Sequence, residues 1–371
     1  MAKRGNNEGS ISKRKDGRWM GRYTVYTANG PKQKSIYGKT REEVAQKLTK
    51  AMADRDGGLY FEAENLTISA FLERWLNDSV RGSVRASTYK SYRRQVDRYI
   101  VPAIGRTKLK KLAPAHVQGL YRSMLDRGLA TRTVQYTHAV LRRAMKQAVR
   151  WGMIPRNPCD DTDPPKLQRE EIRPLDREQA CRLLEAAEGD RLEALYKLAL
   201  HTGMRPGELL ALRWEDVDLD GKTLRVSRAL SEGQFTPPKR AKSRRSIDLN
   251  AGSITALRAH RKRQLEEMMQ KAGLWQDYGL VFPSNVGTPL SHRNVVRSFK
   301  AVLHRAGLPS SVRLYDLRHT CATLLLSRNV HPKYVQELLG HASIALTLDT
   351  YSHVLPSMKS GTASAMEEAL G

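Results

Sequence analysis

The sequence predicts a multidomain chain, mostly α-helical with small β-sheets. Three observations indicate this. An alternating, turn-punctuated pattern at the start of the chain gives way to a helical repeat, and the last 200 residues mix the two patterns. The length of 371 residues suffices for two or three separate cores. The formal net charge of +26 is unevenly placed, with +8 in residues 1–60, +13 in residues 61–157 and +5 in the rest.

Residues 1–57 are predicted to form a three-stranded sheet followed by a helix. The strands are short, partly alternating and rich in Tyr, Val, Ile and basic residues: 10–14, 18–27 and 32–38. Asp16-Gly17 and Asn29-Gly30 separate them, and such pairs favour tight hairpin turns because they tolerate positive φ. Thr40 and Glu43 then form a T-x-x-E capping pattern that opens a helix through about residue 54.

This small sheet is a candidate DNA reader. Fewer than 60 residues make a thin core, so a free-standing catalytic unit is not expected here. A basic sheet of this size can enter a DNA groove. Its candidate DNA-binding residues are Arg18, Arg22, Lys32 and Lys34.

Residues 64–157 are predicted to be entirely helical. Helices should begin near Thr67, at Ser87 or Thr88, near Pro114 and near residue 131. Apolar side chains recur at helical spacing and can share one core: Tyr89, Tyr92, Val96 and Ile100.

Basic side chains should lie outside that core. A solvated face is one interpretation, but the scarcity of acidic residues there favours a face that contacts DNA. The candidates are Arg93, Arg94, Arg142, Arg143 and Lys146.

After a linker rich in Pro and Asp, residues 172–371 are predicted to be mixed α+β. Helices are expected at 176–187, 191–202, 207–216, 251–272, 291–306, 316–328 and 332–339. A small sheet should form from TLRVSRAL and RRSIDL.

The charge predicts a polyanionic partner, because Lys and Arg that neutralise phosphates release counterions. Anionic lipid is the alternative, but no amphipathic anchor or lipidation motif accompanies the charge. Three distant cysteines and the lack of a long apolar run predict a cytosolic, soluble protein that does not bind membranes: Cys159, Cys181 and Cys321.

Four stretches of the last segment place polar chemistry at the ends of predicted elements. HTGMRPGELLALRWEDVD holds Arg205, and TPPKRAKSRRSIDL holds Lys239. RLYDLRHT holds Arg318, and LLGHASIALTLDTYSHV holds His341 and Tyr351. Each residue alone has a simpler interpretation, such as an ion pair of Arg205 with the glutamate three residues later.

In this order and spacing, the four stretches resemble the catalytic domain of the tyrosine recombinases, or phage integrase family. The resemblance implies that Arg205 and Arg318 are the catalytic arginines, Lys239 the hairpin lysine, His341 the second-box histidine and Tyr351 the nucleophile. Lys242 is a second candidate for the lysine. Upstream, residues 1–57 resemble an arm-type DNA-binding domain and residues 64–157 a helical, SAM-like core-binding domain.

One position departs from the family pattern. Three residues before the second arginine, where the family most often has histidine, stands Tyr315. A tyrosine can donate a hydrogen bond to a phosphate oxygen, but with a pKa of about 10 it carries no charge near neutral pH. His319 is expected to point away from the site as a structural residue, and His353 to cap or orient the segment of the nucleophile.

The resemblance implies a site-specific recombinase, the integrase of a phage or integrative element. Tyr351 would form a 3′-phosphotyrosine while the two guanidiniums bind the phosphate oxygens. Lys239 would protonate the leaving 5′ oxygen, and His341 would contact the phosphate and help to handle the tyrosine proton. No metal or nucleotide cofactor is implied. The implied partners are core and arm attachment sites in double-stranded DNA, a homotetramer on that DNA, an excisionase and a host DNA-bending protein.

Other functions remain open on the sequence alone. A metal-dependent nuclease would use His201, His341, His353 and Asp349, although their spacing matches no known metal signature. A type IB topoisomerase shares the tyrosine chemistry. A DNA-binding regulator with an inactive recombinase domain is the third alternative, and Tyr315 is its only support.

Overall fold

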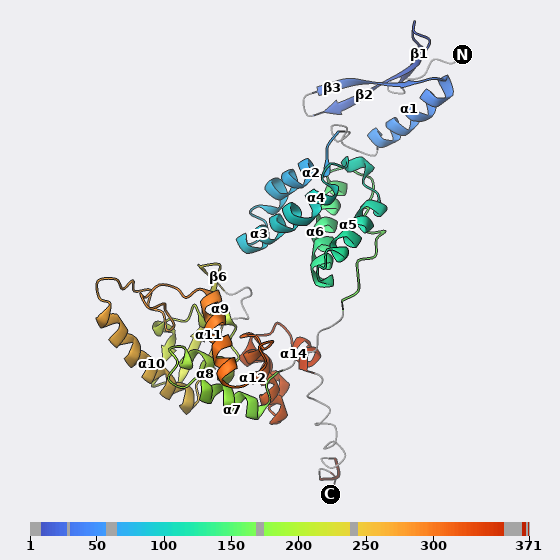
Figure 1. The fold of residues 1–371 in the computed structure, drawn as a ribbon. Coiled ribbons are helices and arrows are strands. Elements are labelled where there is room, and N and C mark those ends of the chain that lie inside the picture. Colours follow the sequence, from blue (N-terminus) through green and yellow to red (C-terminus); the bar gives the residue numbers. More distant parts are fainter. Residues whose placement is uncertain are drawn as a thin grey trace. The chain divides into compact units, whose positions relative to one another are not determined.

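The computed structural model describes residues 9–27, 30–56, 65–167, 174–237, 244–351, 366–368 and 370. The chain divides into two compact units, residues 1–169 and 170–371 (Figure 1). The fold is multidomain and mostly helical with small antiparallel sheets, as the sequence predicts.

The N-terminal sheet has the predicted order. Antiparallel strands β1 (Ser10–Lys13), β2 (Trp19–Thr27) and β3 (Gly30–Gly38) lie side by side, and α1 (Arg41–Asp56) packs on one face. Gly17 takes a positive φ of 80° in the first turn. At the start of α1, the Glu43 N–H donates to Thr40 Oγ1 at 3.1 Å, which confirms the predicted cap.

The helical segment of the first unit contains five α-helices among its described residues: α2 (Ile68–Trp75), α3 (Ala86–Gln95), α4 (Val101–Ile104), α5 (Pro114–Asp126) and α6 (Thr131–Arg150). Thr67 caps α2 and Pro114 opens α5, both as predicted. Single π-helical turns, η2 (Leu76–Val80) and η3 (Val96–Ile100), extend α2 and α3.

The core of this bundle follows the predicted spacing. Val96 and Ile100 are buried, while Tyr89 and Tyr92 are partly buried and pack against the same core. Trp75 is 1 % exposed and stacks on Tyr92 with the ring centroids 6.0 Å apart. The apolar stripe therefore fixes which side of α3 faces outward.

The second unit is built mainly from helices: α7 (Arg177–Ala186), α8 (Glu193–Thr202), α9 (Pro206–Leu209), α10 (Ala251–Gln270), α11 (His292–Arg305), α12 (Asp316–Ser327), α13 (Pro332–Leu339) and α14 (Ile344–Tyr351). Two small sheets complete it: β4 (Val217–Asp218), β5 (Thr223–Val226) and β8 (Arg245–Asp248) in one, and β6 (Ala229–Ser231) with β7 (Gln234–Thr236) in the other. The buried helix α8 packs against both α10 and α12.

The predicted helix over 207–216 is wrong. The α-helix ends at Leu209, and a single 3₁₀ turn, η5 (Trp214–Asp216), follows. Tertiary bonds replace helical ones here, because the Trp214 N–H donates to the carbonyl of Gly279 and the Leu212 carbonyl accepts from Val281, both at 2.9 Å. A second difference is α14, a helix that was not predicted from the sequence.

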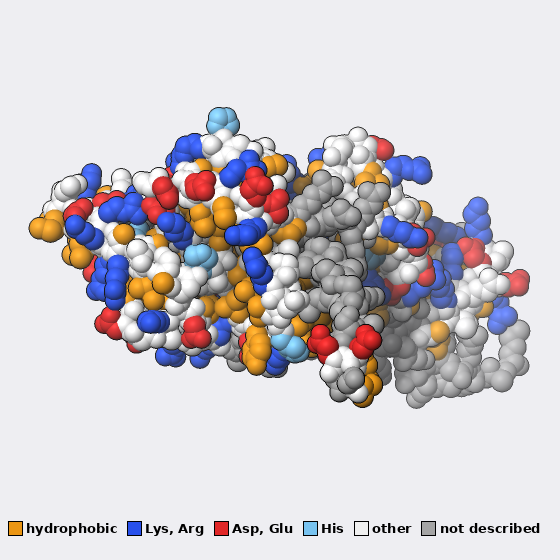
Figure 2. Space-filling view, turned by 90° about the horizontal axis from the view of Figure 1, so that it is seen from below, with side chains coloured by type: hydrophobic (Ala, Val, Ile, Leu, Met, Phe, Trp, Pro, Cys, Tyr) orange, Lys and Arg blue, Asp and Glu red, His pale blue; other side chains and the backbone are white. Residues whose placement is uncertain are grey.

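In Figure 2, Lys and Arg side chains are interspersed with Asp and Glu side chains over the visible face. This mixture agrees with the nearly balanced charge of residues 158–371. Within the described residues, none of the helices has the length and apolar character needed to cross a membrane.

Candidate active site

Arg318 joins three of the four predicted catalytic segments. It lies in the first turn of α12 and is 1 % exposed. Its Nη1 donates to the carbonyl of Gly203 at 2.8 Å, and its Nη2 donates to the carbonyl of Leu339 at 2.7 Å. Gly203 lies two residues before Arg205, and Leu339 lies two residues before His341. One buried guanidinium therefore holds the arginine turn and the histidine turn together.

Burial lowers the pKa of Arg318 to about 10, and the positive charge of Arg205 adds to this effect. The guanidinium therefore still carries its charge near neutral pH. Two such charges close together make a strongly anion-attracting site.

The turn that carries Arg205 requires a glycine. Gly203 ends α8 with a φ of 59°, and a Cβ there would lie 2.5 Å from Leu339 Cδ2. Only glycine allows the carbonyl that Arg318 binds to come this close to α13. The glycine of the TGMR stretch is thus part of the site's construction.

Arg205 forms the ion pair with Glu208 that was the simpler interpretation of this residue in the sequence. Its Nη1 lies 2.7 Å from Glu208 Oε1, yet 34 % of its side chain stays exposed. Glu208 Oε2 also accepts from Arg245 Nη2 at 3.1 Å, and Arg245 Nε donates to the carbonyl of Leu338 at 2.6 Å. Although burial alone would raise it, the attraction of Arg245 and Arg205 lowers the pKa of Glu208, so the carboxylate stays charged.

Arg245 is a site residue that sequence reasoning did not single out. It is the first residue of β8. Its hydrogen bonds link Glu208, the ion-pair partner of Arg205, to the end of α13. The signal in the sequence was the paired arginine directly before the apolar strand SIDL. Nothing in that pattern identified Glu208 as its partner.

His341 follows the left-handed Gly340 that ends α13. Its Nδ1 lies 2.8 Å from Thr347 Oγ1 of α14, and the side chain is buried. Burial first, and then the charges of Arg318 and Arg205, lower the pKa of His341 to about 4. Near neutral pH this imidazole is therefore uncharged.

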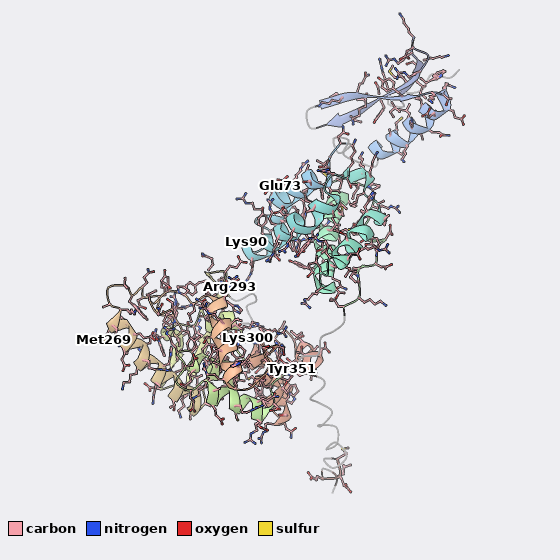
Figure 3. The ribbon with its side chains drawn as sticks, in the orientation of Figure 1. Glu73, Lys90, Met269, Arg293, Lys300 and Tyr351 are labelled. Carbon is pink, nitrogen blue, oxygen red and sulfur yellow. The ribbon has the colours of Figure 1, made fainter. Side chains whose placement is uncertain are left out.

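Tyr351 is the last residue of α14 and is fully buried (Figure 3). Its ring packs against a small apolar cluster from two helices, α12 and α13: Ala322, Leu326, Val335 and Leu339. Its hydroxyl oxygen lies 2.9 Å from Nδ1 of His319, and the two ring centroids are 5.7 Å apart.

The prediction that His319 points away from the site is wrong. Successive residues of a helix are turned by about 100°, so His319 does face a different side of α12 from Arg318. That side is covered by α14, the helix that was not predicted, and α14 brings Tyr351 to the imidazole.

Both of these side chains favour their uncharged forms. Burial raises the pKa of Tyr351 above its ordinary value, with Arg318 working in the opposite direction. Burial also lowers the pKa of His319, and Arg318 adds to this, while Asp316 opposes it. Both side chains are therefore uncharged near neutral pH, and the tautomer of the imidazole decides which of the two atoms donates.

Tyr315 lies directly before α12, beside the pair just described. It is 40 % exposed, and its ring meets the imidazole of His319 edge to face, with centroids 5.3 Å apart. Its backbone carbonyl accepts from the Arg318 N–H at 3.1 Å. The residue that departs from the expected histidine thus sits at the solvent side of His319.

The lysine candidates, Lys239 and Lys242, lie outside the described residues, as does His353. The described chain stops after β7 at residue 237 and resumes at residue 244, directly before β8. The expectation that a lysine stands at this hairpin stays a prediction.

The residues of the metal-nuclease alternative make other contacts. His201 Nδ1 lies 2.8 Å from Ser253 Oγ of α10, and Asp349 is exposed. In the parts of the chain that the structure covers, no group of three or more His, Cys, Asp or Glu is arranged to hold a metal ion.

The candidate DNA-binding residues of the sheet do not share one face. Lys32 and Lys34 pair with Val25 and Tyr23, whose side chains are buried under α1, so both lysines are on the helix-covered side. Arg22 pairs with Ser35 on the opposite face. Arg18 lies in the first turn and forms an ion pair with Asp16 at 3.0 Å; these four residues therefore present basic charge on two sides.

Three of the five candidates in the bundle lie together on α6. Arg142, Arg143 and Lys146 line a hollow of about 630 Å³ beside His138. Arg143 Nη1 donates to the hydroxyl of Tyr92 at 2.8 Å, and Arg94 is exposed on α3.

The expected scarcity of acidic partners in the bundle does not hold everywhere. Arg93 binds Glu73 of α2 through two hydrogen bonds, the shorter 2.5 Å, and Arg142 Nε donates to Asp160 at 2.7 Å. The acidic residues are few, but the fold brings them from distant positions to these arginines. Arg143 and Lys146 have no such carboxylate among the described contacts.

The comparisons with known proteins show a tyrosine-type site-specific recombinase, an enzyme class that breaks and rejoins DNA strands. The model of the "Phage integrase family" matches residues 173–358, and that of the "Phage integrase, N-terminal SAM-like domain" matches residues 67–125. The chain therefore belongs to the phage integrase family.

Relatives support the same assignment. A "Tyrosine recombinase XerC-like" protein of Caldanaerobacter subterraneus subsp. tengcongensis is 29 % identical over 359 residues, covering 91 % of this chain and 92 % of its own. An "Integrase" of Streptomyces ambofaciens is 30 % identical over 337 residues, covering 87 % and 86 %. Nothing among these matches favours the regulator with an inactive domain.

Solved structures share the fold. The Tn1549 transposon integrase in complex with a circular intermediate DNA has a TM-score of 0.69 at 21 % identity, covering 82 % of this chain and 100 % of its own. A lambda integrase tetramer bound to a Holliday junction has a TM-score of 0.60 at 19 % identity, covering 94 % and 97 %.

Proposed function

We propose that Tyr351 is the nucleophile of this recombinase and that Arg205 and Arg318 bind the phosphate under attack. The observation that carries the proposal is the pair of hydrogen bonds that Arg318 donates to the carbonyls of Gly203 and Leu339. It ties the segments of Arg205 and His341 to α12, on which His319 meets Tyr351. Three of the four motifs, spread over about 150 residues, are linked by these contacts.

The reaction follows from these groups. The phenolic oxygen of Tyr351 bonds to phosphorus, the bond from phosphorus to the 5′ oxygen breaks, and a 3′-phosphotyrosine results. Negative charge that builds on the non-bridging oxygens is stabilised by the two guanidiniums and by hydrogen bonds from His341 and Tyr315. Lys239 protonates the leaving 5′ oxygen, with Lys242 as the second candidate. A 5′-hydroxyl of another DNA strand then reverses the step.

The upstream segments supply DNA binding. Residues 64–157 bind the core site. Arg94, Arg143 and Lys146 are the best-placed DNA contacts, because no described carboxylate pairs with them. Arg93 and Arg142 contribute less, since each is held by an acidic side chain. Residues 1–57 bind a separate arm site, through Arg22 on one face of the sheet and through Arg18, Lys32 and Lys34 at its turn and covered side.

The biological setting is the integration and excision of a mobile element. Relatives named as integrases, and neighbours from a transposon and from lambda, support it. Four protomers meet on the DNA, because recombination of two duplexes needs four strand cuts. An excisionase and a host DNA-bending protein assist in the bacterial cytoplasm.

A suicide substrate, whose cleaved strand loses a short 5′-hydroxyl fragment, tests the proposal by trapping the covalent adduct. Tyr351→Phe should bind this DNA as the parent does and form no adduct, because the ring stays and the oxygen is gone. Tyr334→Phe is the matched control, since Tyr334 lies nearby on α13 but is 67 % exposed. It should form adduct at the parental rate.

Excess chelator should leave adduct formation unchanged. Adduct that persists in Tyr351→Phe, or that needs a divalent ion, contradicts the proposed chemistry.

A further inference from the structure

We propose that His319 is a catalytic residue: its Nδ1 holds the hydroxyl of Tyr351 before attack and accepts the phenolic proton as the oxygen bonds to phosphorus. The inference deepens the proposed function and rests on Tyr351 being the nucleophile. It adds a base that the motif resemblance does not assign, one residue beyond the second arginine.

Geometry carries the first step. The hydroxyl oxygen of Tyr351 lies 2.9 Å from Nδ1 of His319, a normal hydrogen-bond length. In the imidazole tautomer that carries its hydrogen on Nε2, Nδ1 of His319 accepts the hydrogen of the phenol, and this is the tautomer that can take the proton. The atom that must lose a proton on attack is therefore already bonded to a nitrogen that can take it.

The other candidate bases are less well placed. His341 uses its Nδ1 for Thr347 Oγ1 at 2.8 Å. Tyr315, at the position where the family most often has histidine, is a phenol and cannot accept a proton near neutral pH. Its ring instead lies edge to face on His319, which fixes the plane of the imidazole. The histidine missing at 315 is thus replaced in function by the next histidine on the same side of α12.

Burial explains why Tyr351 and His319 stay uncharged until the attack. Tyr351 is fully buried, so an unassisted phenolate would form in a poorly solvated place. Transfer to His319 instead creates an imidazolium, while the new ester bond removes the charge from the phenolic oxygen. In the reverse step the 5′-hydroxyl attacks phosphorus, and His319 returns its proton to the departing tyrosine oxygen. Proton and electron pair balance in both directions.

The charged and titratable groups that act on His319 come from four segments: Arg313, Tyr315, Asp316, Arg318, His341 and Tyr351. Asp316 opposes the depressed pKa of His319, and Arg318 and Arg313 add to it. Because the base must be uncharged and burial lowers its pKa, cleavage should fall only when the pH drops below that lowered pKa, which lies under the ordinary histidine value of about 6.5. A variant without an imidazole at 319 should lack this acid limb.

The decisive experiment uses the full-length protein and two suicide duplexes. One has an ordinary phosphate at the cleaved bond, and the other has sulfur in place of the bridging 5′ oxygen. A thiolate leaves without protonation, so sulfur rescues the loss of a general acid but not the loss of the base for tyrosine. His319→Asn keeps an acceptor oxygen near the position of Nδ1 and cannot take the proton.

We expect His319→Asn to lower the rate of adduct formation by about 10²- to 10⁴-fold on both duplexes, with DNA binding and thermal unfolding like the parent's. Lys239→Ala should be slow on the phosphate and rescued on the sulfur duplex. His304→Asn, at the exposed end of α11, should match the parent. His319→Ala is a second variant that should show the same loss on both duplexes. If it fails to fold, His319→Asn alone decides the test.

Three results overturn the inference. Parental rates for His319→Asn would show that no proton passes to 319. Rescue of this variant by sulfur would place His319 on the leaving-group side. Faster cleavage by His319→Asn would show that the hydrogen bond between His319 and Tyr351 restrains the nucleophile instead of activating it. In each case adduct at Tyr351 would still form, whereas failure of the proposed function appears as adduct in Tyr351→Phe.

Discussion

At the scale of single residues, consecutive side chains of α12 serve two different parts of the site. Arg318 donates to backbone carbonyls of the segments that carry Arg205 and His341, and Nδ1 of His319 lies 2.9 Å from the hydroxyl oxygen of Tyr351. Their separation of about 100° around the helix allows both contacts from one turn. A substitution at either position should therefore produce a different kinetic defect.

Tyr315 gives a prediction at this scale. If its hydroxyl donates to a phosphate oxygen, Tyr315→Phe should slow adduct formation by about tenfold to a hundredfold, the effect of losing one hydrogen bond to a charged group. Tyr315→His should retain activity, because an imidazole N–H can make the same bond. Single-turnover rates on the suicide duplex measure both. A Phe variant with the parental rate would limit Tyr315 to packing on His319.

The residues of the site were predictable to different degrees. Arg205, Arg318, His341 and Tyr351 stood in three of the four ordered motifs, and the structure brings these three segments together. His319 was misjudged because its contact depends on α14, whose apolar and β-branched sequence gave no clear helical stripe. Arg245 depends on a carboxylate 37 residues earlier, and such a pairing is not encoded in local spacing.

At the scale of elements, the site depends on short connections rather than on long helices. α9 has four residues and ends where the chain turns to bond with residues 279–281. The helical pattern over 207–216 was overridden because Leu209, Leu210 and Leu212 are all buried, which one helical face does not achieve. The predicted bounds of the longer helices, such as α10 and α12, agree within about two residues.

Gly203 gives the prediction at this scale. Gly203→Ala adds a Cβ 2.5 Å from Leu339 Cδ2 at a φ of 59°, so both the clash and the left-handed strain oppose it. We expect a loss in free energy of unfolding of about 2 kcal/mol or more, and slower cleavage as the carbonyl bound by Arg318 moves. Chemical denaturation and adduct rates measure these effects.

Gly307→Ala is the matched control. Gly307 has a φ of 63°, but a Cβ there would meet nothing within 4 Å. This variant should show the left-handed strain alone, about 1 to 2 kcal/mol, with parental cleavage. Equal stability losses in the two variants would mean that α13 yields to the new methyl group.

At the scale of the whole molecule, the prediction concerns two DNA contacts on one chain. A fragment of residues 64–371 keeps the bundle and the catalytic segments, so it should cleave a core-site suicide duplex. It should fail in recombination that depends on arm sites, because the second contact and its effective concentration are lost. Footprinting with this fragment and with residues 1–62 decides the matter. Protection of one shared sequence by both fragments would refute two-site binding.

The uneven charge is the basis of this prediction of two DNA contacts. The chain has 64 Lys and Arg against 38 Asp and Glu, and most of the excess positive charge lies before residue 158. The distribution within each element was not predictable, because register decides the face of a strand residue. Lys32 and Lys34 were grouped with Arg22, and the sheet pairing puts them on opposite sides.

The most direct test of the central claim is the chemical identity of the covalent adduct formed by the parent protein. After digestion with trypsin, the DNA-linked peptide should span residues 334–359, and fragmentation in the mass spectrometer should place the phosphate on Tyr351. The attached nucleotide should be joined through its 3′ phosphate, with a free 5′-hydroxyl on the released strand. A phosphate on Tyr334, or a link through a 5′ phosphate, would contradict the account.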